Sequence, residues 1–212
     1  MRIGGIILCG GQSRRMGRDK AHLPFGRETM LERVVSEVGI VVGPRQIVVA
    51  AAEGQVLPPL PPEIRVVHDL QADCGPMSGL AAGLSALREE ADAVFVGTCD
   101  APLLRAEFIS GLFDRLGDAE AVVPVERGAE GDRFYPATAV YRTSVLPGVR
   151  ADLEAGQFRM QWFARDLRAV FLPIEELRSI DPDLASLRNV NSPEEYLAAL
   201  DWAGLKPGEG GG

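Results

Sequence analysis

The sequence predicts an α/β fold, a doubly wound and mostly parallel sheet flanked by helices, and three observations lead to it. First, apolar segments of strand length alternate with segments of helical periodicity along most of the 212 residues. Second, several strand-length segments are apolar at every position, which is typical of strands buried on both faces of a parallel sheet. Third, a chain of this length with 46% hydrophobic and 25% charged residues can bury a core of its own. This alternation favours helices on both faces of one sheet.

Each element follows from its local pattern. An apolar run bounded by glycine predicts the first strand at 4–8, and a serine–proline–acid start at Ser192 predicts the last helix. The region 126–141 departs from the alternation, because a polar turn that contains glycine precedes its apolar strand. The remaining strands are expected at 46–52, 64–67, 93–97, 121–125 and 137–141. The remaining helices are expected at 29–38, 75–87, 105–116 and 157–166.

Three glycines mark one face of the helix expected at 75–87. Gly75, Gly79 and Gly83 recur at every fourth residue, and this spacing places them on the same side of a helix. Because glycine has no side chain, we expect that face to lie close to another backbone.

Charge and composition exclude several classes of protein. The formal net charge of −8 argues against a broad nucleic-acid-binding surface, and no apolar stretch approaches the length of a membrane span. The three cysteines form no CxxC pair, which favours a reducing compartment, and we expect a cytoplasmic protein. We expect one domain over 1–203, a flexible glycine-rich tail over 204–212, and a monomer or weak homo-oligomer.

A glycine-rich, basic loop follows the first strand. The strand runs through Leu8 and Cys9 into Gly10 and Gly11, and four basic residues and one acid then lie between Arg14 and Lys20. Backbone N–H groups of such a turn can approach a phosphate or a base closely. The nearby cations, Arg15 and Lys20, can neutralise phosphate oxygens. The glycine spacing matches neither the P-loop nor the dinucleotide-binding motif, which disfavours a Rossmann dehydrogenase.

Polar residues at the ends of later segments complete the candidate site. Asp100 comes just after the strand at 93–97, at the edge where open α/β sheets place ligands. Magnesium needs only one or two carboxylates beside phosphate and water, so Asp100 predicts a Mg²⁺ site. The alternative is a turn aspartate that caps the following helix. Asp69 follows the strand at 64–67 on the same edge, with a turn aspartate as its alternative. Asn191 is either a metal or phosphate ligand or a turn residue before a capped helix.

Four segments of the chain resemble motifs of the MobA-like nucleotidyltransferases. The Leu-x-Gly-Gly form of residues 8–11, at the start of the first segment, is most similar to the molybdenum cofactor guanylyltransferases. The segments are GGQSRRMGRDK at 10–20, GPMSGL at 75–80, CDAP at 99–102 and NVNSP at 189–193. The resemblance covers nearly the whole chain. It implies the Rossmann-like fold of the nucleotide-diphospho-sugar transferases. It also implies transfer of GMP from Mg-GTP to the phosphate of molybdopterin, with release of pyrophosphate.

The resemblance and the residue pattern together give each residue an expected role. The expected catalytic residues are Arg15, Lys20 and Asp100. The expected nucleotide-binding residues are Leu8, Cys9, Gly10, Gly11, Lys20, Asp69 and Asp100. Asp100 and Asn191 are expected to bind the metal, with Mg²⁺ as cofactor. Arg133, Tyr135 and Arg159 lie in the irregular region that should face the acceptor.

Other functions remain open at this point. Within the same superfamily the alternatives are a molybdopterin cytidylyltransferase and a sugar-phosphate nucleotidyltransferase. A non-catalytic nucleotide-binding protein is an alternative of another class, although Lys20 and Asp100 are both present. Cys9 stands where the family usually has alanine, and we interpret it as a small buried residue rather than a nucleophile.

Overall fold

An eight-stranded sheet forms the centre of the computed structural model, which describes residues 1–10, 19–68, 75–129 and 131–206. Within these residues the strand order is β10-β7-β9-β6-β1-β4-β5, and β8 pairs with β7. The strands are β1 (Ile3–Leu8), β4 (Ile47–Ala51), β5 (Arg65–His68), β6 (Ala93–Thr98), β7 (Ala121–Glu126), β8 (Arg133–Phe134), β9 (Ala139–Arg142) and β10 (Ala169–Pro173).

The sheet is mostly parallel, as the sequence predicts. β6, β1, β4 and β5 are parallel neighbours, and β10 is parallel to β7. The exceptions are β9, which is antiparallel to both β6 and β7, and the short β8. Ile6 and Ile7 of β1 point to opposite faces of the sheet and are both fully buried, which explains the unbroken apolar run.

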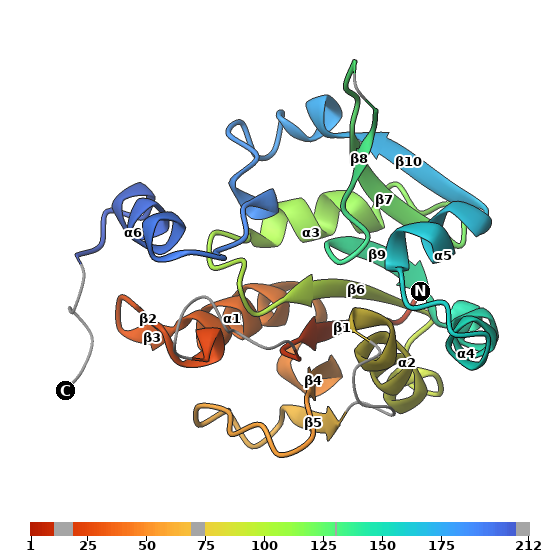
Figure 1. Cartoon of the computed structure of the whole chain (residues 1–212), viewed down its shortest axis with the longest axis horizontal. Helices are drawn as coiled ribbons and strands as arrows, with labels where there is room; N and C mark the ends of the chain where they lie inside the picture. The colour runs from red at the N-terminus through yellow and green to blue at the C-terminus, as the bar shows by residue number, and fades with distance from the viewer. Residues whose placement is uncertain (11–18, 69–74, 130, 207–212) are drawn as a thin grey trace.

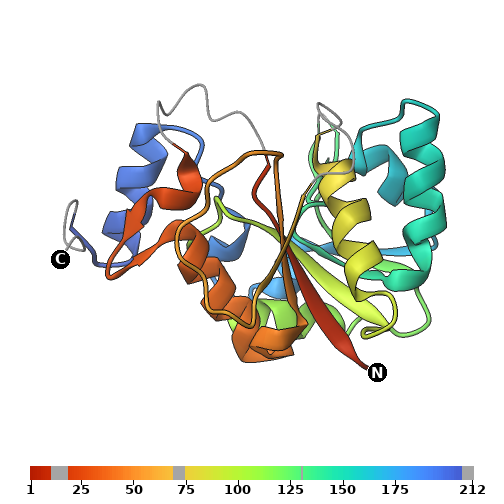
Figure 2. The same cartoon turned by 90° about the horizontal axis from the view of Figure 1, so that it is seen from below.

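Helices cover both faces of the sheet (Figures 1 and 2). One face carries α1 (Met30–Val42) and α3 (Ala106–Phe113), which pack against each other. The other carries α2 (Pro76–Leu87), α4 (Leu146–Glu154) and α5 (Met160–Asp166), which form one apolar cluster with the sheet. A third cluster joins α6 (Pro193–Trp202) to the hairpin of β2 (Pro24–Phe25) and β3 (Glu28–Thr29). Short 3₁₀ turns are η1 (Lys20–His22), η2 (Pro44–Gln46), η3 (Thr143–Val145), η4 (Ile174–Leu177) and η5 (Ala185–Leu187).

The element boundaries differ from the sequence expectations at several places. The helix expected at 157–166 begins only at Met160, and the helix expected at 29–38 continues to Val42. Neither α4 nor β10 was predicted. The expected cap of the last helix is confirmed, since Ser192 and Glu195 form a capping box at α6. In the tail, Leu205 packs against the third apolar cluster, and 207–212 lie outside the described residues.

Glycine is favoured at Gly83 of α2 and at Gly75, its N-cap, for different structural reasons. A Cβ at Gly83 would lie 2.6 Å from a side-chain carbon of Ile6, so close packing of the helix on β1 requires a glycine there. The same explanation is wrong for Gly75. Its Cβ would meet open space, and its backbone has φ 62°, a left-handed conformation at the N-cap that favours glycine. The close neighbour of Gly83 is therefore a side chain of β1 rather than the expected backbone, and no described residue lies that close to Gly75.

No helix in the described part of the chain is long and apolar enough to cross a membrane.

Candidate functional site

Three side chains that are far apart in the sequence meet at the carboxyl edge of the sheet. The Lys20 ammonium donates to Asp100 Oδ2 at 3.0 Å and to Asn191 Oδ1 at 2.9 Å. The side chains of Lys20 and Asp100 are 15% and 17% exposed, so their ion pair is largely shielded from water. The structure thus brings together the described members of the predicted catalytic and metal-binding sets.

Asp100 is held in place by its own strand end and by the C-terminal segment. It follows β6, where Thr98 Oγ1 donates to Asp100 Oδ1 at 2.6 Å. Its backbone carbonyl accepts a 2.7 Å hydrogen bond from the N–H of Val190, a buried residue. This bond fixes Asn191 beside the Asp100 carboxylate, because Val190 and Asn191 are neighbours in the chain.

The alternative of Asp100 as a helix cap is wrong. Arg105 is the N-cap residue of α3, and no side chain caps the helix from that position. Glu37 of α1 does so instead, since its Oε2 accepts from the N–H of Ala106 at 2.9 Å. Of the two carboxylate oxygens of Asp100, Oδ2 accepts from Lys20 and Oδ1 accepts from Thr98.

Asp19 and Gln55 fasten the end of the basic loop to the sheet. Asp19 Oδ1 accepts from the N–H of Ala21 at 3.0 Å and so caps η1, which carries Lys20. Gln55 Nε2 donates to Asp19 Oδ2 at 2.7 Å and to the Cys9 carbonyl at 3.1 Å. These contacts tie Lys20 to the end of β1. Gln55 could not be predicted from the sequence, because no pattern marks a glutamine that bridges two loops.

The two cysteines beside the site are buried next to each other. Cys9 and Cys99 extend β1 and β6 by one residue, and the N–H of Cys99 donates to the Leu8 carbonyl at 3.1 Å. Hydrogen bonding with Cys99, together with burial, raises the pKa of the Cys9 thiol well above its ordinary value. Cys9 is therefore protonated at neutral pH, which agrees with its interpretation as a small buried residue.

The other predicted nucleotide-binding residues have mixed positions. Leu8 and Cys9 are buried at the end of β1, and Gly10 is exposed just beyond it. Three predictions, Gly11, Arg15 and Asp69, lie outside the described residues.

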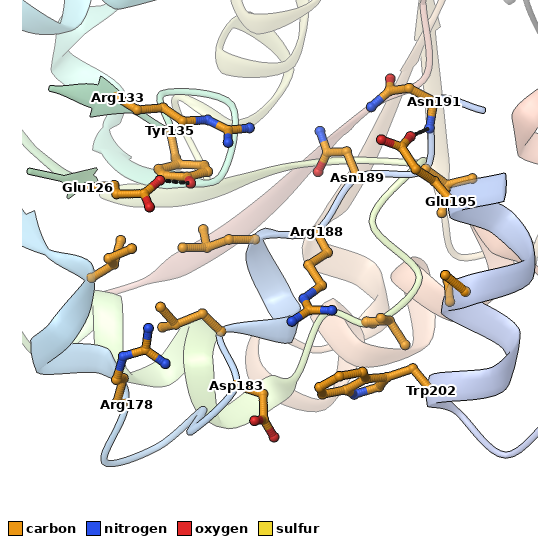
Figure 3. Close-up of a pocket in the computed structure, with 17 residues that line it drawn as sticks. Glu126, Arg133, Tyr135, Arg178, Asp183, Arg188, Asn189, Asn191, Glu195 and Trp202 are labelled. Carbon is orange, nitrogen blue, oxygen red and sulfur yellow. Dashed lines mark hydrogen bonds between the residues drawn. The ribbon is translucent and has the colours of Figure 1, made fainter. Parts of the chain in front are cut away.

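A polar pocket of about 460 Å³ opens beside Asn191 (Figure 3). Arg133 and Tyr135 form one wall, and Trp202 of α6 stands on the opposite side, with Arg188 between them. The Tyr135 hydroxyl donates to Glu126 Oε2 at 3.0 Å. Burial and this acceptor raise the pKa of Tyr135, so its hydroxyl keeps its proton. Arg159 is not among the lining residues, because it is the N-cap residue of α5, which packs on the other face of the sheet.

The oxygen atoms at the site suit a hard cation. Asp100 Oδ2 and Asn191 Oδ1 converge on one positive charge, the Lys20 ammonium, within 3.0 Å each. A carboxylate and an amide oxygen are ligands that Mg²⁺ accepts when phosphate and water complete its shell. No cluster of three or more His, Cys, Asp or Glu side chains suited to a metal occurs among the residues that the structure describes. The donor set fits a metal that is shared with a phosphate substrate.

Comparisons with known proteins agree with this geometry. Residues 5–170 match the MobA-like NTP transferase domain. The chain is 32% identical to a probable molybdenum cofactor guanylyltransferase of Methanosarcina mazei, over 96% of this chain and 92% of the relative. It is 36% identical to a protein described in the same words from Mycobacterium marinum, over 93% of each chain.

Solved structures share the fold at lower sequence identity. The molybdopterin-guanine dinucleotide biosynthesis protein A of Archaeoglobus fulgidus has a TM-score of 0.75 at 22% identity and covers 95% of this chain and 98% of its own. The 2-C-methyl-D-erythritol 4-phosphate cytidylyltransferase of Thermus thermophilus has a TM-score of 0.70 at 14% identity, over 97% and 100%. The domain match and the identity to full-length relatives together show that this chain is a nucleotidyltransferase and belongs to the MobA-like NTP transferase family.

Proposed function

We propose that the protein transfers GMP from Mg-GTP to the phosphate of molybdopterin and releases pyrophosphate. The observation that carries the proposal is the convergence of Lys20, Asp100 and Asn191 at the carboxyl edge of the sheet. Relatives that align over most of the chain are described as probable molybdenum cofactor guanylyltransferases, and this supports GTP and molybdopterin as the substrates. We place the reaction in the cytoplasm, as the cysteine usage suggests, and in a monomer or weak homo-oligomer.

The protein's own residues mainly position the substrates and stabilise charge. Asp100 and Asn191 would hold Mg²⁺, which when bound would offset the charge that builds on the α-phosphate and the leaving pyrophosphate. Lys20, together with Arg15, supplies positive charge to the same phosphates. The backbone from Leu8 to Gly11 carries the nucleotide at the end of β1, and Asp69 contributes a further contact to it.

The chemical step needs no nucleophile from the protein. An oxygen of the acceptor phosphate attacks the α-phosphorus of GTP, a new P–O bond forms, and the bond to the β-phosphate oxygen breaks. The acceptor phosphate is ionised at neutral pH, so no general base is required. The protonated thiol of Cys9 is consistent with this direct transfer, because the thiolate would be the reactive form.

Pyrophosphate release tests the proposal. GTP, CTP and UTP are compared with Mg²⁺, with and without molybdopterin, and again after chelation of the metal. Release from GTP that requires both molybdopterin and Mg²⁺ supports the proposal. Preference for CTP contradicts guanylyl transfer, and release with a sugar phosphate instead of molybdopterin contradicts the acceptor.

Asp100→Asn should abolish the metal-dependent release. Asp114→Asn is the matched control, because Asp114 is an exposed aspartate at the end of α3, away from the site. If Asp100→Asn keeps full activity, Asp100 does not bind the metal.

A further inference from the structure

The pocket beside Asn191 contains arginines that lack acidic partners. Among the described residues, Arg133, Arg178 and Arg188 all line the pocket, and none forms an ion pair with a carboxylate. The chain as a whole carries a formal charge of −8. A general excess of basic residues therefore does not explain why these arginines lack carboxylate partners.

Two of the three acids that line the pocket already have other donors, and the third, Asp183, forms no ion pair among the described residues. Glu126 accepts from the Tyr135 hydroxyl at 3.0 Å. Glu195 Oε2 accepts from the N–H groups of Asn191 and Ser192, at 2.6 and 3.1 Å. Neither carboxylate is paired with an arginine, and both are fixed by local structure. The guanidinium groups of Arg133 and Arg188 therefore remain available to a ligand, whereas Arg178 donates one N–H to the Pro182 carbonyl at 2.8 Å.

Aromatic rings hold two of these arginines in defined orientations. The guanidinium carbon of Arg188 lies 4.3 Å from the ring centroid of Trp202, and that of Arg133 lies 4.9 Å from the ring of Tyr135. Stacking on a ring orients the planar group and leaves the N–H donors at its edge free. Such donors form a fork that matches the oxygens of a phosphate or carboxylate.

The pocket adjoins the ion pair of Lys20 and Asp100 through Asn191. The side chain of Asn191 lines the pocket and also accepts the hydrogen bond from Lys20. In the sheet, β7 and β8 flank the pocket on the side of β6 that is opposite to β4 and β5. A ligand in the pocket would therefore reach Asn191 from the side away from the first strands. The volume of the pocket, about 460 Å³, suits a small organic molecule.

We propose that this pocket binds the acceptor of the transfer, an anionic phosphate ester with a polar ring, and that Arg188 on Trp202 determines its recognition. The inference rests on the proposed function, because it assigns the second substrate to a place. Arg133 contributes a second cation from the opposite wall, and the amide of Asn189 offers a donor and an acceptor to the ring. The surface at Arg159 on α5 is then not the acceptor site.

Steady-state kinetics with molybdopterin as the varied substrate test Arg188. Arg188→Met removes the fork and keeps much of the side-chain length, and we expect the KM for molybdopterin to rise about tenfold or more. The KM for GTP should stay within about twofold. Arg188→Lys should recover only part of the loss, because a point charge replaces the fork. Arg45→Met is the matched control, since Arg45 is an exposed arginine before β4, at the opposite end of the strands.

The two tryptophans of the chain provide a readout that is independent of turnover. Trp202 lines the pocket, and Trp162 lies on α5 with Arg159 over its ring. In Trp162→Phe, the fluorescence of Trp202 should change on titration with molybdopterin. In Trp202→Phe, the fluorescence of Trp162 should stay constant. A response of Trp162 with a silent Trp202 places the acceptor on α5 and overturns the inference.

The outcomes separate this inference from the proposed function. If the wild-type protein releases no pyrophosphate with GTP and molybdopterin, the proposed function fails and the assignment of the pocket fails with it. If the wild-type protein is active while Arg188→Met leaves the KM for molybdopterin unchanged, only the assignment of the pocket is overturned.

Discussion

Replacement of Lys20 by methionine separates a catalytic role from a structural one. The ammonium makes two hydrogen bonds, at 3.0 Å to Asp100 and at 2.9 Å to Asn191, in a site where its side chain is 15% exposed. Loss of hydrogen bonds to a charged group costs about 1.5–3 kcal/mol of folding free energy. For a domain of this size each kcal/mol lowers Tm by roughly 2–4 °C. The Tm of Lys20→Met should therefore be several degrees lower than that of the wild type, and the variant should remain folded at 25 °C.

The effect on turnover should be larger than the effect on stability. Removal of one positioned donor from a transition state that develops negative charge lowers the rate about 100- to 1000-fold. We therefore expect kcat/KM for GTP to fall by that factor at 25 °C, measured by pyrophosphate release. Thermal unfolding of the same sample gives the folded fraction, and Arg45→Met controls for removal of an exposed cation.

If Lys20→Met keeps kcat/KM within about threefold of the wild type, a catalytic role of Lys20 is contradicted. The same holds if the loss of activity only follows the loss of folded protein. In either case the ammonium would serve the fold by pairing with Asp100, and the positive charge at the phosphates would have to come from elsewhere.

Three further substitutions test the surroundings of the site. Cys9→Ala should keep kcat within about threefold of the wild type, because the raised pKa of the Cys9 thiol leaves it protonated. A large loss of kcat would indicate that Cys9 takes part in the reaction. Gly83→Ala should lower the free energy of unfolding by about 1–3 kcal/mol, because the added carbon meets Ile6, and an unchanged denaturant midpoint would contradict the close packing. Asp181→Ala should raise the KM for molybdopterin and lower Tm. Its buried carboxylate accepts two backbone N–H bonds that shape the segment before Arg188, and a normal KM would show that this segment needs no such support.

The strands of the central sheet could be predicted because burial on both faces leaves a simple signal. Every position of β4 is buried, and its sequence is apolar throughout. β10 was missed because it lies at the edge of the sheet, alternates in exposure and ends at Pro173. Helix α4 was missed because only Leu146, Val149 and Leu153 are buried, and Pro147 and Gly148 in its first turn are weak helix formers.

The candidate site could be predicted only in part, for a comparable reason. Asp100 and Asn191 stand at recognisable places, after a buried strand and before a capped helix. Their meeting with Lys20 depends on tertiary contacts such as the bond from Val190 to the Asp100 carbonyl, which no local pattern encodes. Arg133 and Tyr135 were expected to face the acceptor with Arg159. The structure places Arg159 on another face, because the helix for which it is the N-cap packs against the α2 and α4 side of the sheet.

Transfer of label from α-labelled GTP to molybdopterin tests the role of the converging side chains most directly. Wild-type protein and Asp100→Asn are compared at equal folded concentration over a range of Mg²⁺, with Asp114→Asn as the control. We predict that the wild type and the control incorporate labelled GMP only when Mg²⁺ is present, and that Asp100→Asn incorporates almost none. Equal incorporation by Asp100→Asn, or incorporation by the wild type that does not depend on Mg²⁺, would contradict a metal-nucleotide site at Asp100.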